Sequence, residues 1–148
     1  MKRSSLYVLA AALAAALTLA LLPVQQSAVA DGHGGSDGQE AIHEAMEELG
    51  GTYRLVRRQM KDPEKNADTA EKLAAMIDAS VKAKAYLPET ATTDDLKTSY
   101  RVIMNKLIIV LAQAENAALQ GDNEKLQEYV KQANAVKGEG HELFITEE

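Results

Sequence analysis

Residues 38–61 have the sequence GQEAIHEAMEELGGTYRLVRRQMK, in which apolar residues recur at spacings of four and three. This spacing aligns them on one face of a helix and is typical of helices that pack in bundles. Gly50 and Gly51 each cost about 1 kcal/mol of helix stability relative to Ala, yet the apolar stripe continues beyond them. We therefore expect one continuous helix, whose apolar face consists of Ile42, Met46, Leu49, Tyr53, Val56 and Met60.

Proline and capping residues mark where this helix ends and where the next one lies. Asp62-Pro63 ends the first helix, because Pro lacks the N–H that would continue the hydrogen bonds of the helix. Asp68 is a good N-cap for a second helix over about residues 68–87, with Glu71 three positions later as in a capping box. Pro88 then stops this second helix.

Two further apolar segments complete the chain. The third can be capped by Thr92 or Thr93 and is the most apolar of the four. Gly121 followed by Asp122 predicts a tight turn into the fourth, which runs to Phe144. Patterns typical of strands are absent from the sequence. Four helical segments joined by short turns predict an all-α fold, an antiparallel up-down-up-down four-helix bundle.

The first 30 residues have the features of a secretory signal peptide. Lys2 and Arg3 precede an apolar run over residues 6–22, and the small residues at 27–30 match the site that a signal peptidase recognises. The alternative is an uncleaved membrane anchor, but the run is short for a membrane span. We expect cleavage after Ala30 and export to the periplasm.

Removing 30 of the 148 residues leaves 118, which we divide into a flexible tail over residues 31–37 and one helical domain over residues 38–148. Without Lys2 and Arg3 the chain has 14 basic and 22 acidic residues, a net charge of -8. That charge disfavours nucleic acid and membrane surfaces and favours a partner with a basic surface. We expect a monomer or weak dimer. The sequence has no Cys, which excludes disulfides, thiolate catalysis and covalently attached haem.

Met46 and His141 are the residues that this topology could bring together. In an up-down-up-down bundle, the start of the first helix and the end of the fourth lie at the same end of the molecule. A Met thioether facing a His imidazole is a ligand pair for haem iron. Each residue alone also has a simpler interpretation, Met46 as a core residue and His141 as a half-exposed residue near a helix C-terminus.

Other candidate chemistry is sparse. The sequence has no nucleophile-elbow, phosphate-binding-loop or zinc-protease motif, and we expect no enzymatic activity. Glu40 and His43 have the spacing of one di-iron ligand pair, but the second and third helices bring no inward Glu, so we interpret the pair as surface residues. Cleavage after Ala30 would expose Asp31-Gly32-His33, whose amine, amides and imidazole can bind Cu(II) in a square plane. The simpler interpretation is a flexible tail that contains a His.

Three short stretches resemble the soluble cytochrome b562 family, and the resemblance extends over nearly all of residues 40–144. The turn at Gly121 also falls where that family turns between its third and fourth helices. The three stretches are Glu44 to Leu49, Asp95 to Tyr100 and Lys137 to His141.

The resemblance implies that Met46 and His141 are the axial ligands of a non-covalent haem b, with Leu96 and Tyr100 lining its pocket. It also implies a periplasmic electron-transfer protein, whose redox partner the sequence does not identify. Gly138 and Gly140 loosen the helix beside His141, and the chain end is acidic. These two features support an alternative, a haem-free periplasmic bundle that acts as an interaction or stress protein.

Overall fold

Helices account for nearly all of the computed structural model, which describes residues 35–145. The predicted all-α four-helix bundle is confirmed, and no strand occurs within these residues. The chain divides into two units, residues 1–30 and residues 31–148, and all the described residues belong to the second. The elements are α1 (Ser36–Gln59), the short 3-10 helix η1 (Pro63–Lys65), α2 (Asn66–Lys84), α3 (Asp94–Leu119) and α4 (Asn123–Phe144).

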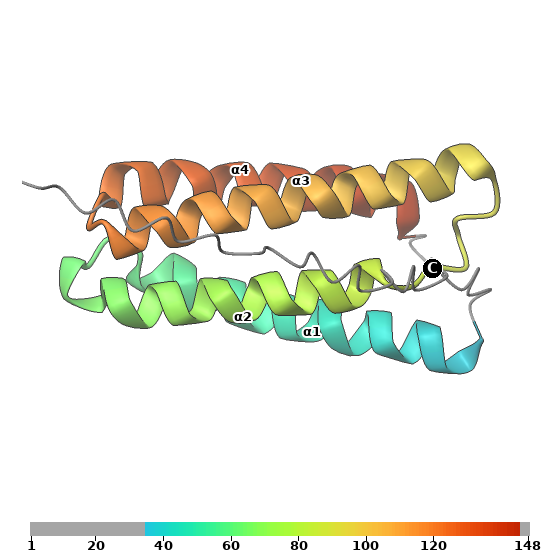
Figure 1. The fold of residues 1–148 in the computed structure, drawn as a ribbon, viewed down its shortest axis with the longest axis horizontal. Coiled ribbons are helices and arrows are strands. Elements are labelled where there is room, and N and C mark those ends of the chain that lie inside the picture. The colour runs from blue at the N-terminus through green and yellow to red at the C-terminus, as the bar shows by residue number, and fades with distance from the viewer. Residues whose placement is uncertain (1–34, 146–148) are drawn as a thin grey trace, which may run out of the picture. The chain divides into compact units, whose positions relative to one another are not determined.

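Consecutive helices run in opposite directions, so the start of α1 and the end of α4 lie at the same end of the bundle (Figure 1). Two hydrogen bonds tie the loop between α2 and α3 to both of these helix ends, one to the start of α1 and one to the end of α4. Gln39 Nε2 near the start of α1 donates to the carbonyl of Leu87 at 3.0 Å. Thr90 Oγ1, three residues later, donates to the carbonyl of Phe144 at the end of α4 at 3.1 Å.

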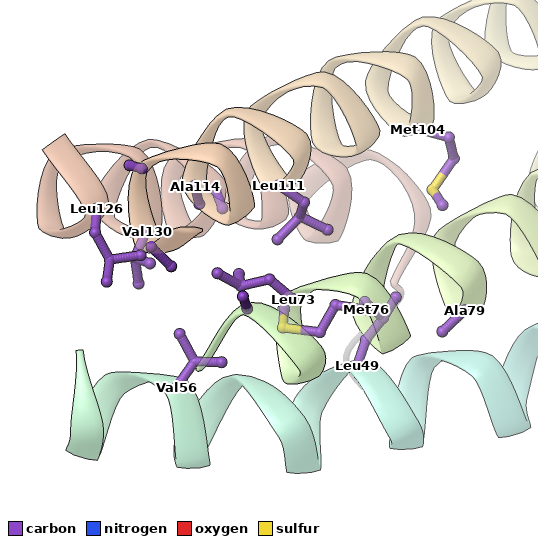
Figure 2. Packing of buried hydrophobic residues seen from close by; sticks show 14 of the residues in the cluster. Leu49, Val56, Leu73, Met76, Ala79, Met104, Leu111, Ala114, Leu126 and Val130 are labelled. Atoms are coloured by element: carbon purple, nitrogen blue, oxygen red, sulfur yellow. The ribbon is translucent and has the colours of Figure 1, made fainter. Parts of the chain in front are cut away.

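The core runs along the bundle axis and receives large side chains from every helix (Figure 2). Val56, Leu73, Leu111 and Leu126, one from each helix, have no exposed surface. Many other core positions are alanines, which allow neighbouring helix backbones to approach closely. The closely packed pairs are α1 with α2, α2 with α3 and α3 with α4, whereas α1 and α4 pack more loosely.

Two of the predicted caps are confirmed. The N–H of Leu96 donates to Thr93 Oγ1 at 3.2 Å at the start of α3, so Thr93 rather than Thr92 is the cap. The N–H of Lys125 donates to Asp122 Oδ1 at 3.1 Å at the start of α4. Gly121 has φ +72°, the left-handed conformation that glycine adopts most readily, which explains the tight turn before Asp122.

The predicted cap of α2 is wrong. The helix begins at Asn66, and the carboxylate of Asp68 binds Lys72 Nζ at 2.6 Å instead of capping. That hydrogen bond is the main reason why the pKa of Asp68 is lowered. The helix starts earlier because Pro63 starts η1, which leads directly into α2. Asp62 caps η1, and its Oδ1 accepts from the N–H of Glu64 at 3.0 Å, whereas no side chain caps α2.

The other helix ends differ from the predictions by a few residues. The first helix spans Ser36–Gln59 instead of 38–61, so it begins inside the stretch 31–37 that was predicted as a flexible tail. The second ends at Lys84 instead of 87, because the residue before Pro88 is disfavoured in helical conformation.

Gly50 and Gly51 provide a test of how α1 is stabilised. A Cβ atom added at either position would meet no heavy atom within 4 Å, so the substitutions Gly50→Ala and Gly51→Ala create no clash. Each should raise the free energy of unfolding by up to about 1 kcal/mol, because Ala is the better helix former. Urea denaturation followed by circular dichroism measures the change.

The matched control for these substitutions is Gly121→Ala. Because Gly121 has φ +72°, this change should destabilise the protein by about 1 kcal/mol. Destabilisation by Ala at position 50 or 51 would show that the middle of α1 is not a regular helix in solution.

Candidate functional site

Met46 lies on the side of α1 that faces α4. Tyr53, seven residues or about two turns later, shares this side, and its hydroxyl donates to the carbonyl of Val130 on α4 at 3.4 Å. The Met46 side chain is 37% exposed and does not belong to the core cluster. The interpretation of Met46 as a core residue is therefore wrong, because α1 turns Ala45 and Leu49 into the core instead.

His141 lies on the side of α4 that faces α1. It follows Val130 by eleven residues, about three turns, and therefore shares the orientation of Val130. The residue is exposed, yet partial desolvation and then the nearby charge of Lys137 lower the pKa of its imidazole. Both causes favour the neutral imidazole, which is the form that ligates metals.

The Tyr53–Val130 hydrogen bond sets the register between these two residues. Met46 lies seven residues before Tyr53 on α1, and His141 lies eleven residues after Val130 on α4. Because the two helices are antiparallel, both residues lie on the same side of the hydrogen bond, toward the end of the bundle where α1 starts. The difference of four residues corresponds to about 6 Å along the helix axes, or roughly one turn. Met46 and His141 therefore flank the same end of the α1–α4 seam.

Tyr100 lies beside the last turn of α4. Its ring packs edge-on against the ring of Phe144, with centroids 5.4 Å apart and an interplanar angle of 85°. Its hydroxyl donates to the carbonyl of Ala83 on α2 at 2.9 Å. Burial raises the pKa of Tyr100 to about 12, so the phenol is neutral at physiological pH. The structure thus brings Tyr100 within one turn of His141, through Phe144 three residues further on.

Leu96 is half-buried in the first turn of α3, four residues before Tyr100. It shares the side of α3 on which Tyr100 lies. No contact between Leu96 and Met46 or His141 is evident. Of the four predicted haem-site residues, the structure therefore brings Met46, His141 and Tyr100 to the same end of the bundle, with Leu96 at its edge.

Phe144 and Gly140 are site residues that sequence reasoning did not assign. Phe144 packs on Tyr100, and a Cβ added at Gly140 would lie 3.4 Å from Ile103 on α3. Gly140 therefore lies at the contact between α3 and α4 just before His141, where an alanine would touch Ile103 at van der Waals distance. The sequence could have indicated Phe144, because it lies three residues after His141 and residues three apart share a side of a helix.

A flat prosthetic group between Met46 and His141 would need free space beside both residues. A Cβ added at Gly138, three residues before His141, or at Gly50, four residues after Met46, would meet no heavy atom within 4 Å. The α1–α4 seam, the loosest in the bundle, is therefore open beside both residues. The residues at this end suit haem iron by their donor types, and no side chain fills the space beside Gly50 and Gly138.

Two shallow grooves lie on the described surface, and neither is lined by Met46 or His141. Ala41, Glu44 and Tyr86 contribute to the groove between α1 and α2. In residues 35–145, no three His, Asp or Glu side chains are arranged to hold a metal ion. The candidate copper residues Asp31, Gly32 and His33 lie outside the described residues, so that site stays a prediction.

Comparison with known proteins identifies one family. The family model described as cytochrome b562 matches residues 41–144, which extend from the second turn of α1 to the end of α4. The matched range includes Met46, Leu96, Tyr100 and His141. No curated protein and no solved structure matches the chain.

Substituting Tyr100 by Phe tests the hydrogen bond that holds this end together. Tyr100→Phe removes the phenol donor from the carbonyl of Ala83, which keeps only the longer hydrogen bond from the N–H of Tyr86 at 3.3 Å, and we expect a loss of about 1 kcal/mol in the free energy of unfolding. Chemical denaturation measures the change. The control is Tyr86→Phe, because Tyr86 is 41% exposed, and it should alter stability little.

The same variant should change how stability depends on alkaline pH. Tyr100 ionises near pH 10 in the unfolded chain but near 12 in the folded protein, so its contribution to stability is complete below pH 10 and falls between 10 and 12. Tyr100→Phe should remove this part of the alkaline loss. An unchanged alkaline profile in the variant would contradict the raised pKa.

Proposed function

The chain belongs to the cytochrome b562 family, and on that premise we propose that it is a periplasmic carrier of single electrons that binds a non-covalent haem b between Met46 and His141. The family is one of haem-binding electron carriers rather than enzymes. The observation that carries the proposal is the position of the two residues, which flank one end of the open α1–α4 seam. The signal sequence supports export to the periplasm.

The residues at this end have separable roles in the proposal. Met46 offers a thioether and His141 a neutral imidazole, the two axial ligands. Tyr100 and Leu96 offer apolar surface, and because the Tyr100 hydroxyl is committed to the carbonyl of Ala83, its ring can face an apolar group without an unpaired donor. When bound, haem supplies one-electron redox chemistry, whose potential Met ligation raises.

Charge along α1 supports a partner with a basic surface. The first half of the helix, on both sides of Met46, carries exposed carboxylates, whereas the basic residues of the helix gather in its second half. A basic partner would therefore be steered toward the end that bears Met46 and His141. The carboxylates are those of Asp37, Glu40, Glu44, Glu47 and Glu48.

Ligand substitutions test this proposal directly. Met46→Ala and His141→Ala each remove one iron ligand, so each should alter the Soret and alpha bands of the haem-reconstituted protein or weaken haem binding. Absorption spectroscopy in the oxidised and reduced states, with haem titration, measures both effects.

The matched control is His43→Ala. His43 is exposed and lies 3.9 Å from Glu47 on the outer surface of α1. Its removal should leave the spectrum and the affinity unchanged. Loss of haem in His43→Ala combined with normal binding in His141→Ala would overturn the ligand assignment. A folded wild-type protein that stays colourless with hemin would favour the haem-free alternative.

Haem should also stabilise the bundle by mass action. A ligand that binds only the folded state adds about 2.7 kcal/mol at a concentration one hundred times its dissociation constant. The apo protein should already be helical, because the core side chains from all four helices pack without the group. Thermal melting with and without hemin measures the difference, and equal melting temperatures at saturation would count against a specific site.

A further inference from the structure

Met46 differs from the other methionines of the described residues in its exposure to solvent. Its side chain is 37% exposed. Met76 on α2 and Met104 on α3 are only 3% and 2% exposed and form part of the core (Figure 2). Met60, at the end of α1, is partly buried against that core. One thioether is therefore open to small oxidants in solution while two are enclosed by packed side chains.

We propose that Met46 is a site of methionine oxidation by peroxide, and that its conversion to the sulfoxide weakens haem binding. The sulfur attacks one peroxide oxygen, the O–O bond breaks, and an S–O bond forms. The sulfur loses two electrons. The second oxygen leaves with its own hydrogen and takes up the proton of the attacked oxygen, so that it departs as water. The oxidant is hydrogen peroxide, a neutral molecule that the carboxylates around Met46 do not repel.

The apo protein would tolerate this change without unfolding. Met46 does not belong to the core cluster, so the polar sulfoxide can extend into solvent instead of entering packed apolar surroundings. Oxidation of Met76 or Met104 would instead place a polar oxygen in the core and destabilise the bundle. Oxidation of Met46 would therefore alter one site, whereas oxidation of Met76 or Met104 would destabilise the whole domain.

The effect on haem rests on the proposed function. A thioether donates one of its two sulfur lone pairs to iron. Oxidation commits one lone pair to the S–O bond and leaves the other on an electron-poor, more crowded sulfur. The sulfoxide thus lacks the soft donor that Met46 is proposed to supply. Conversely, iron bound to the sulfur would withdraw electron density from it and shield it from solvent, which would slow its attack on peroxide. Because sulfoxide formation is reversible by methionine sulfoxide reductases, the loss of haem binding would be reversible too.

The experiment treats the mature protein with hydrogen peroxide, without haem and after reconstitution with hemin, and follows each methionine by peptide mass spectrometry. In the apo protein we expect Met46 to be oxidised severalfold faster than Met76 and Met104, with unchanged helical circular dichroism. Haem binding should fall in proportion to the fraction of Met46 sulfoxide. Incubation with reductases for both sulfoxide epimers should restore it, and bound haem should slow oxidation at Met46 alone.

The matched control variant is Met60→Leu, which removes the other methionine with any access to solvent. It should keep the full peroxide sensitivity of haem binding. Oxidation of Met46 no faster than that of Met76 and Met104, or loss of helical signal in step with Met46 oxidation, would overturn the modification site. Selective oxidation of Met46 with undiminished haem binding and an unchanged haem spectrum would instead overturn its role as a ligand, and with it the proposed function, while leaving the modification site established.

Discussion

The hydrogen bond from Tyr100 to the carbonyl of Ala83, together with the packing of its ring on Phe144, joins three helices at one end of the bundle. Tyr100 belongs to α3, Ala83 to α2 and Phe144 to α4. The position of the last turn of α4, and so of His141, depends on this residue. A buried phenol whose donor is satisfied can serve both as an apolar wall and as a fixed anchor.

Small residues decide which helices approach closely and which do not. Alanines fill much of the contact between α2 and α3, where the backbones can lie close together. Along the α1–α4 seam, by contrast, Gly50 and Gly138 lack close neighbours, and the hydrogen bond from Tyr53 to Val130 crosses the seam. The bundle is therefore closed on three sides and open on the side where the candidate ligands lie. An open seam gives a prosthetic group room without dismantling the core.

The exposure of Met46 also makes its sulfur accessible to oxidants. A methionine whose sulfur is accessible to iron in the apo protein is also accessible to peroxide, because both reagents accept an electron pair from the same sulfur atom. Met76 and Met104 are protected by the same packing that makes them unsuitable as ligands. If Met46 ligates haem as proposed, its exposure links cofactor binding to the presence of oxidants through a single side chain.

The sequence by itself determined the helices, their order and most of their caps, since apolar periodicity, Thr93, Gly121 and Asp122 act within a few residues of the chain. It also predicted the family to which the chain belongs. It misplaced the start of α2, because η1 leads directly into α2 at Asn66 and Asp68 therefore lies inside the helix, where it does not cap.

Only the tertiary structure decided how α1 is rotated in the bundle. Both Ala45 and Met46 lie near the apolar stripe, and spacing alone favoured Met46 as the buried one. The close packing of α1 on α2 turned Ala45 into the core and left Met46 at the open seam. Rotation of a helix is set by the surfaces of its neighbours, which the local periodicity of one segment does not contain.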